Sequence, residues 1–179
     1  MTDPEANMTG KEFLESLMRK PEYVAMRKAQ DAKIAAMEAL LSVDEAALIA
    51  DLSAVGEPLR SVWDLVNRNG PPIPAAINVL AAHLGKPHHY RTLEGIVRAL
   101  TVPEAKGTAG RTLMSSLERS TSAEEKPFRW AVLNALAVVG DRSLLESLEV
   151  LIARGVLAEQ GDRIINAALR GCKKRKAQS

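Results

Sequence analysis

The stretch that decides the fold runs from Phe128 to Arg154 and reads FRWAVLNALAVVGDRSLLESLEVLIAR. Its two apolar halves each have the length of a helix, and Gly140 and Asp141 form a turn between them, with Asp141 as the expected N-cap of the second helix. The first half is apolar on nearly every side, which is typical of a helix packed between neighbours, so we expect Trp130 in the core. The stretch therefore predicts a pair of helices at the structural centre of the chain.

The same pattern recurs earlier and later in the chain as three Ala-Leu pairs. These pairs are Ala99-Leu100, Ala135-Leu136 and Ala168-Leu169, which lie 36 and 33 residues apart. Each pair falls near the end of one helix of an expected helical pair. Two-helix repeats of this length are typical of α-solenoids, in which each repeat buries its apolar face only against its neighbours.

The composition agrees with an all-α fold. Of the 179 residues, 46% are hydrophobic but only 3% are aromatic, and a chain rich in Ala and Leu favours helices over sheets. The single cysteine, Cys172, excludes an intrachain disulfide. We see no signal peptide and no apolar run of the roughly 20 residues that a membrane helix needs, so we expect a cytoplasmic protein that does not bind membranes.

We expect four regions along the chain. Residues 1–8 are a disordered leader, residues 9–56 form N-terminal helices that cap the fold, residues 57–171 form the helical repeats, and residues 172–179 are a basic tail. Two capping boxes, which begin at Thr9 and Ser42, predict that separate helices start there. The expected repeat helices span 59–69, 74–84, 88–102, 111–119, 128–139, 142–154 and 162–171.

Two segments carry a resemblance to a known family. Arg129–Leu136 (RWAVLNAL) and Arg91–Leu100 (RTLEGIVRAL) resemble the inner helix of bacterial HEAT-like repeats, in the variety that is rich in Ala and Leu and has an early Arg. The resemblance covers residues 58–171. It implies a short right-handed α-solenoid of HEAT-like helix pairs, with inner helices that line a concave binding surface. This broad class includes adaptor and scaffold proteins, immunity-type proteins, DNA-repair glycosylases and bilin lyases, and the fold does not choose among them.

The clearest candidate site is a polar stripe formed by Arg91, Glu94 and Arg98, which are spaced i, i+3, i+7. It is either a charged recognition stripe facing a groove or a solvated helix face with a Glu94–Arg98 pair worth about 0.3–0.5 kcal/mol. Trp and Tyr are enriched among residues that anchor protein interfaces, which adds the neighbouring aromatic residues to the set. The complete set of expected partner-binding residues is Trp63, Asn67, Tyr90, Arg91, Glu94, Arg98 and Arg129.

No motif in the chain indicates catalysis. His83, His88 and His89 are close in sequence, but no cysteine or carboxylate stands at metal-motif spacing, so we expect polar residues at helix starts and no metal site. Cys172 has no partner motif for nucleophilic catalysis and is expected to be an incidental thiol. We therefore expect no cofactor and no enzymatic activity, and interpret the chain as a protein-binding module of the adaptor or immunity type.

The alternative interpretation is nucleic-acid binding, related to HEAT-like DNA-repair glycosylases. Arg91, Arg98, Arg129 and the basic tail would then contact phosphates, and Trp63 would stack on a base. The distribution of charged residues along the chain argues against nucleic-acid binding. Residues 1–60 carry seven basic and eleven acidic side chains, and residues 61–179 carry 17 and 11, but five of those later positive charges lie at the C-terminal end. The middle is near neutral, so the broad basic footprint is missing. A plain bundle of four or five helices is the third interpretation.

Overall fold

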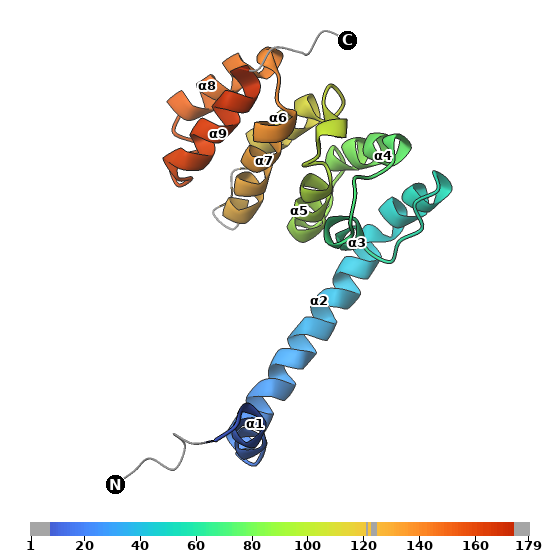
Figure 1. The fold of residues 1–179 in the computed structure, drawn as a ribbon, viewed down its shortest axis with the longest axis vertical. Coiled ribbons are helices and arrows are strands. Elements are labelled where there is room, and N and C mark those ends of the chain that lie inside the picture. Colours follow the sequence, from blue (N-terminus) through green and yellow to red (C-terminus); the bar gives the residue numbers. More distant parts are fainter. Residues whose placement is uncertain (1–7, 121, 123–124, 174–179) are drawn as a thin grey trace. The chain divides into compact units, whose positions relative to one another are not determined.

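The computed structural model describes residues 8–120, 122 and 125–173, and in these ranges the secondary structure is helical, with no strand (Figure 1). The all-α prediction is confirmed. The expected leader, apart from Met8, and the tail beyond Lys173 lie outside the described residues. The chain divides into two compact units, residues 1–40 and residues 41–179.

The first unit contains helix α1 (Gly10–Met18) and the first part of helix α2 (Pro21–Ala54). The capping box at Thr9 is confirmed. The Thr9 hydroxyl accepts the N–H of Glu12 at 3.4 Å, and the Thr9 N–H donates to Glu12 Oε2 at 2.8 Å. Among residues 8–40, none is buried. The helices of this unit are thus stabilised by local interactions and not by a core of their own.

The second predicted capping box is wrong. Helix α2 continues through Ser42 without a break and ends at Ala54, and Gly56 follows with φ +93°. The reason is the position of Glu45. Its side chain is buried, and Oε2 accepts the backbone N–H of Val62 at 3.0 Å instead of turning back to cap Ser42. Because neither Gly nor Pro interrupts the sequence near Ser42, the backbone stays helical.

In its described residues, the second unit continues with α-helices and short 3₁₀ helices: α3 (Trp63–Asn67), α4 (Pro74–Leu84), α5 (Tyr90–Ala99), η1 (Pro103–Ala105), α6 (Gly110–Arg119), α7 (Lys126–Val139), η3 (Arg142–Leu144), α8 (Leu145–Ala153) and α9 (Asp162–Lys173). Helix α3 is shorter than predicted. The Asp64 carboxylate accepts the N–H groups of Arg60 and Ser61 at 3.0 and 3.3 Å, which holds those residues in a turn ahead of the helix. The predicted N-cap Asp141 is confirmed, since its carboxylate accepts the Ser143 N–H at 2.8 Å.

An ion pair between the buried Glu57 and the half-buried Arg68 holds the segments before and after α3 together. The Arg68 guanidinium donates to both carboxylate oxygens of Glu57, at 2.6 and 3.0 Å, and Glu57 also accepts the N–H of Ile73 at 3.2 Å. The hydrogen bonds from Arg68, and after them the one from Ile73, hold the pKa of Glu57 below its ordinary value despite its burial. This charge-assisted pair therefore fixes the loops on either side of the five-residue helix α3.

The helices of this unit pack in two rows (Figure 1). One row contains α3, α5, α7 and α9 in series, the other contains α4, α6 and α8, and the pairs α4–α5, α6–α7 and α8–α9 join the rows. The repeated Ala-Leu positions lie in the first row, where Ala99, Leu100, Ala135, Leu136 and Ala168 are all buried. The core therefore lies between the rows and between successive members of the first row.

The closest approach within the first row is between α7 and α9. A Cβ atom built on Gly171 would lie 2.4 Å from the carbonyl oxygen of Leu136 and 2.7 Å from the Cα of Ala137. Only glycine allows the two backbones to come this close. The absence of a side chain at Gly171 is therefore what lets α9 lie directly against α7.

Candidate functional site

Two of the predicted residues, Arg91 and Arg98, bind the buried carboxylate of a third, Glu94. Arg98 donates to Oε1 from Nε and Nη2 at 3.0 and 2.8 Å, and Arg91 donates to Oε2 at 3.3 Å. Glu94 is 4% exposed, whereas the side chains of Arg91 and Arg98 are 45% and 38% exposed. The polar stripe on α5 is thus a fixed structure with a buried anchor, not a freely solvated helix face.

Trp63 on α3 extends this arrangement. The guanidinium carbons of Arg91 and Arg98 lie 5.1 and 6.0 Å from the centroid of its ring, within range of cation–π interactions. Helix α5 can approach this closely because Gly95 faces α3. A Cβ there would lie 2.5 Å from Val62 Cγ1 and 3.2 Å from Trp63 Nε1. Because Gly95 has no side chain, the Trp63 ring can pack directly against α5.

Trp130 on α7 continues the same surface, and the prediction that it is a core residue is wrong. It is 45% exposed, and the guanidinium carbon of Arg98 lies 5.9 Å from the centroid of its ring. The opposite faces of α7 are already filled by smaller apolar residues such as Val132 and Leu136, so the large ring points outward. Trp130 and Asn134 share one exposed face of α7, and the Asn134 side chain donates to the Trp130 carbonyl at 3.0 Å.

A shallow depression of about 630 Å³ adjoins Trp130. Helix α9 supplies its far side through Arg163, Ile164, Ala167 and Arg170, and both arginines are exposed. None of these α9 residues was among the predicted site residues. We name the set the Trp–Arg surface: Trp63, Arg91, Arg98, Trp130, Arg163 and Arg170.

The other predicted site residues, Asn67, Tyr90 and Arg129, are not part of the Trp–Arg surface. Asn67 is the last residue of α3 and is exposed, and Tyr90 opens α5 with its ring 4.6 Å from that of His89. Arg129 is only 3% exposed. Its guanidinium donates to the Ser122 carbonyl at 2.8 Å and forms an ion pair with Glu159. Because Arg129 is turned into the protein, we leave it out of the Trp–Arg surface.

The three histidines hold α2 to the start of α5. His83 Nδ1 and His88 Nε2 lie 3.0 Å apart, and the other ring nitrogens face Asp51 at 2.8 Å and Asp44 at 3.4 Å. His89 is the N-cap of α5 and accepts the Arg91 N–H, as the helix-start interpretation predicts. Throughout the described ranges, no group of three or more His, Cys, Asp or Glu residues could hold a metal ion.

This histidine pair is flanked by two carboxylates with lowered pKa values. The hydrogen bond to His83 is the main cause for Asp51. Burial by itself would raise the pKa of Asp44, but the neighbouring Thr92 hydroxyl, the His89 N–H and the charge of His88 together lower it. Both aspartates are therefore ionised at neutral pH and hold the two rings in place.

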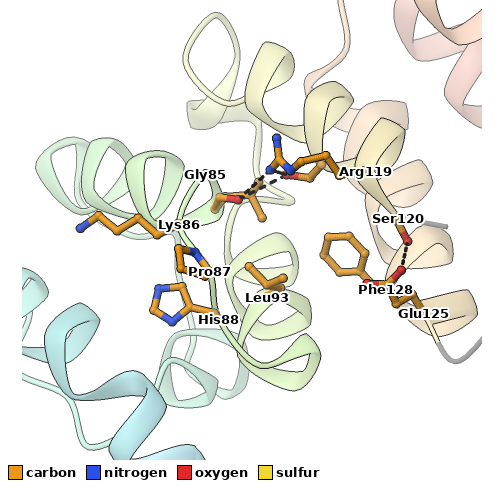
Figure 2. Close-up of a pocket in the computed structure, with 11 residues that line it drawn as sticks. Gly85, Lys86, Pro87, His88, Leu93, Arg119, Ser120, Glu125 and Phe128 are labelled. Carbon is orange, nitrogen blue, oxygen red and sulfur yellow. Dashed lines mark hydrogen bonds between the residues drawn. The ribbon is translucent and has the colours of Figure 1, made fainter. Parts of the chain in front are cut away.

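A second, smaller cavity of about 300 Å³ lies between the α4–α5 link and the end of α6 (Figure 2). The Leu84 carbonyl accepts from Ser116 and from Arg119, both at 3.4 Å, and Ser120 donates to Glu125 at 3.2 Å. Figure 2 shows Lys86 extending away from Arg119. Because these polar groups bind one another, the lining joins the end of α4 to α6 and the end of α6 to the start of α7.

Cys172 is fully buried next to Gly140. Burial, together with the charge of Asp141, raises the pKa of its thiol to about 11. A thiol that stays protonated at neutral pH is a poor nucleophile. The geometry therefore supports a packing role for Cys172.

No model of a known protein family matches this chain, and no curated protein and no solved structure matches it either. In the part of the chain that the structure describes, no helix has both the length and the apolarity needed to cross a bilayer.

Proposed function

We propose that the chain is a protein-binding module whose Trp–Arg surface holds an acidic segment of a partner protein. The observation that carries the proposal is the composition of this surface. Four exposed guanidinium groups, on Arg91, Arg98, Arg163 and Arg170, lie around two tryptophan rings, and the buried Glu94 carboxylate pairs with the first two of them. Trp and Arg are the residues most enriched among those that dominate binding at protein interfaces.

We also propose that helices α3–α9 form a short HEAT-like solenoid. The two rows of helices support it, since the first row would be the inner layer and the second row the outer layer of such a stack. The Trp–Arg surface is built from α3, α5, α7 and α9 alone. In a solenoid the inner layer faces the bound molecule, so this placement fits an adaptor or immunity-type role.

The arginine contacts of the two tryptophan rings favour a protein partner over a nucleic-acid partner. Both rings already have arginine guanidinium groups within about 6 Å, and the Glu94 carboxylate holds two of those groups in position. Proteins that bind single strands instead leave aromatic faces open for stacking on bases. The guanidinium edges that remain available suit the carboxylates of an acidic peptide, which they can bind in a bidentate manner.

The test is affinity purification from the native cell with three forms of the chain. These are the wild type, the double variant Arg98→Ala with Trp130→Ala, and a matched control, Arg142→Ala with Val150→Ala. Each double variant removes one exposed arginine and one exposed apolar side chain, but the control residues lie on η3 and α8, which carry no residue of the Trp–Arg surface. We expect the wild type and the control to retain the same protein and the first variant to lose it.

Direct titration of that protein gives the magnitude. A residue that dominates an interface contributes about 2 kcal/mol or more, so each single change, Arg98→Ala or Trp130→Ala, should weaken binding by roughly 30-fold. Equal retention by all three forms contradicts the proposal. Tight binding of a DNA or RNA oligonucleotide at low salt that Arg98→Ala abolishes would replace the protein partner with a nucleic acid.

A further inference from the structure

The first unit exposes an unusual amount of apolar side chain. Among residues 8–40, where no residue is buried, nine large apolar side chains are between 39% and 60% exposed: Met8, Phe13, Leu14, Met18, Val24, Met26, Ile34, Met37 and Leu40. Helices shorter than about 12–15 residues are marginal in water, and most helical stability in proteins comes from packing an apolar face. Exposed apolar surface on this scale marks an interaction site.

Part of this apolar surface lies in one ordered stripe along α2. The half-buried Tyr23 and the exposed Met26 are three residues apart, the exposed Ile34 and Met37 repeat the same spacing, and the second pair follows the first by eleven residues. Eleven residues make three turns of an α-helix, so the two pairs lie on the same face. Pairs of this kind occupy the core positions of coiled coils.

Charged residues flank both pairs in the same way. Glu22 directly precedes the first pair and Arg27 directly follows it, while Lys33 precedes the second pair and Glu38 follows it. All four are exposed. In each case the flanking residues are five positions apart and opposite in sign, which is the spacing at which flanking residues of neighbouring coiled-coil helices meet.

This pattern is complementary to itself. If a second identical helix lies alongside in the parallel direction, Glu22 meets Arg27 of the second copy and Lys33 meets Glu38 of the second copy. If the second helix runs antiparallel, Glu22 meets Lys33 and Arg27 meets Glu38. Either direction pairs opposite charges around a seam made of the two apolar pairs with Gln30 between them. We therefore infer that residues 21–40 of α2 bind the same segment of a second copy of this chain.

The inference is tested by measuring the mass of the full chain in solution by light scattering and sedimentation. We expect a species of twice the 19.4 kDa chain mass. The double variant Ile34→Lys with Met37→Lys removes half of the seam and should raise the dimer dissociation constant by roughly 100-fold or more. Both residues are exposed, at 48% and 40%, so the change leaves the fold of a single copy intact.

A matched control adds the same two charges elsewhere on α2. Ala25→Lys with Ala32→Lys places two lysines on a different side of the helix, at positions that are also exposed. This variant should dimerise like the wild type. A monomeric wild type at several hundred micromolar overturns the inference, whatever other molecule then covers the face. Equal weakening by both double variants overturns it too.

Charge reversal tests the pairing itself. Glu22→Lys should weaken the dimer by roughly fivefold, since two symmetry-related pairs become repulsive. Restoration by Arg27→Glu in the same chain indicates parallel helices, and restoration by Lys33→Glu indicates antiparallel helices. Failure of both second changes to restore the dimer overturns the charge-matched seam. The readout is independent of the Trp–Arg surface, so it holds whether or not a partner protein binds there.

Discussion

Replacement of Gly171 by alanine tests the packing that builds the first row of helices. The added Cβ would lie 2.4 Å from the Leu136 carbonyl oxygen and 2.7 Å from both the Cα and the carbonyl oxygen of Ala137. Ordinary contacts of a Cβ begin near 3.4 Å, so α9 must move away from α7 by roughly 1 Å. Because the contacting atoms are all backbone, no side-chain rotation can relieve them.

The magnitude follows from two opposing terms. Overpacking of a filled core costs about 1–3 kcal/mol, and rigid backbone contacts put this case at the upper end. Alanine is a better helix former than glycine by about 1 kcal/mol, which offsets part of the cost. We therefore expect Gly171→Ala to lower the free energy of unfolding by about 2 kcal/mol, or the melting temperature by about 4–8 °C in a chain of this size.

The control for this experiment is Gly85→Ala. Gly85 is the C-cap of α4 with φ −84°, and its added Cβ would meet only the Ala82 carbonyl oxygen, at an ordinary 3.4 Å. Alanine should be neutral there or stabilise by up to about 1 kcal/mol, by restricting the unfolded chain. Urea denaturation with matched m-values is the assay. A Gly171→Ala protein as stable as the wild type would refute the close packing of α7 and α9.

Three further predictions concern other parts of the second unit. Arg68→Ala should lower the free energy of unfolding by about 1.5–3 kcal/mol at pH 7, because it leaves the buried Glu57 carboxylate without its main partner. The pKa of Glu57 is lower in the folded than in the unfolded protein, so the stability that the ion pair gives is present at neutral pH. It is lost as the pH falls through the folded pKa. The urea midpoints of the wild type and Arg68→Ala should therefore converge at low pH. The Cys172 thiol should resist a thiol reagent at pH 8 in the folded protein and react fully in urea, because the pKa of the thiol in the folded protein is about 11. Rapid labelling of the folded chain would contradict the burial of Cys172. Gly95→Ala should shift tryptophan fluorescence and near-UV circular dichroism by displacing Trp63, whereas unchanged spectra would show that the ring does not rest on α5.

The helices of the second unit were largely readable from the sequence because helix breakers delimit them. Pro74 and Gly85 bound α4 where the spacing of apolar residues predicts it. The errors arose where a tertiary contact overrides a local signal. The capping pattern is present at Ser42, but Glu45 accepts the backbone N–H of Val62, which lies 17 residues further along the chain. The sequence around Ser42 does not predict that contact.

The candidate site was predictable only in part. The stripe of Arg91, Glu94 and Arg98 lies on one helix, so helical spacing identifies it. Arg163 and Arg170 lie on a different helix, which only the packing of α5, α7 and α9 brings to the same surface. A usable signal was nevertheless present, because the 36- and 33-residue spacings of the Ala-Leu pairs align two sets of residues: Glu94, Trp130 and Arg163, and Arg98, Asn134 and Ala167.

That alignment also explains why Trp130 is exposed while Arg129 is buried. Positions equivalent to Glu94 and Arg98 lie on the side of each helix that carries the Trp–Arg surface, and on α7 these positions are the exposed Trp130 and the half-buried Asn134. Arg129 is one residue out of step with them, which on an α-helix is a rotation of about 100° and turns its side chain into the protein toward Glu159. Since the aligned positions hold different residues, the row carries the exposed Arg91 and Arg98 over the buried Glu94 on α5, the Trp130 indole on α7 and the Arg163 guanidinium on α9. A partner segment that follows the row would meet a distinct chemical group at each helix.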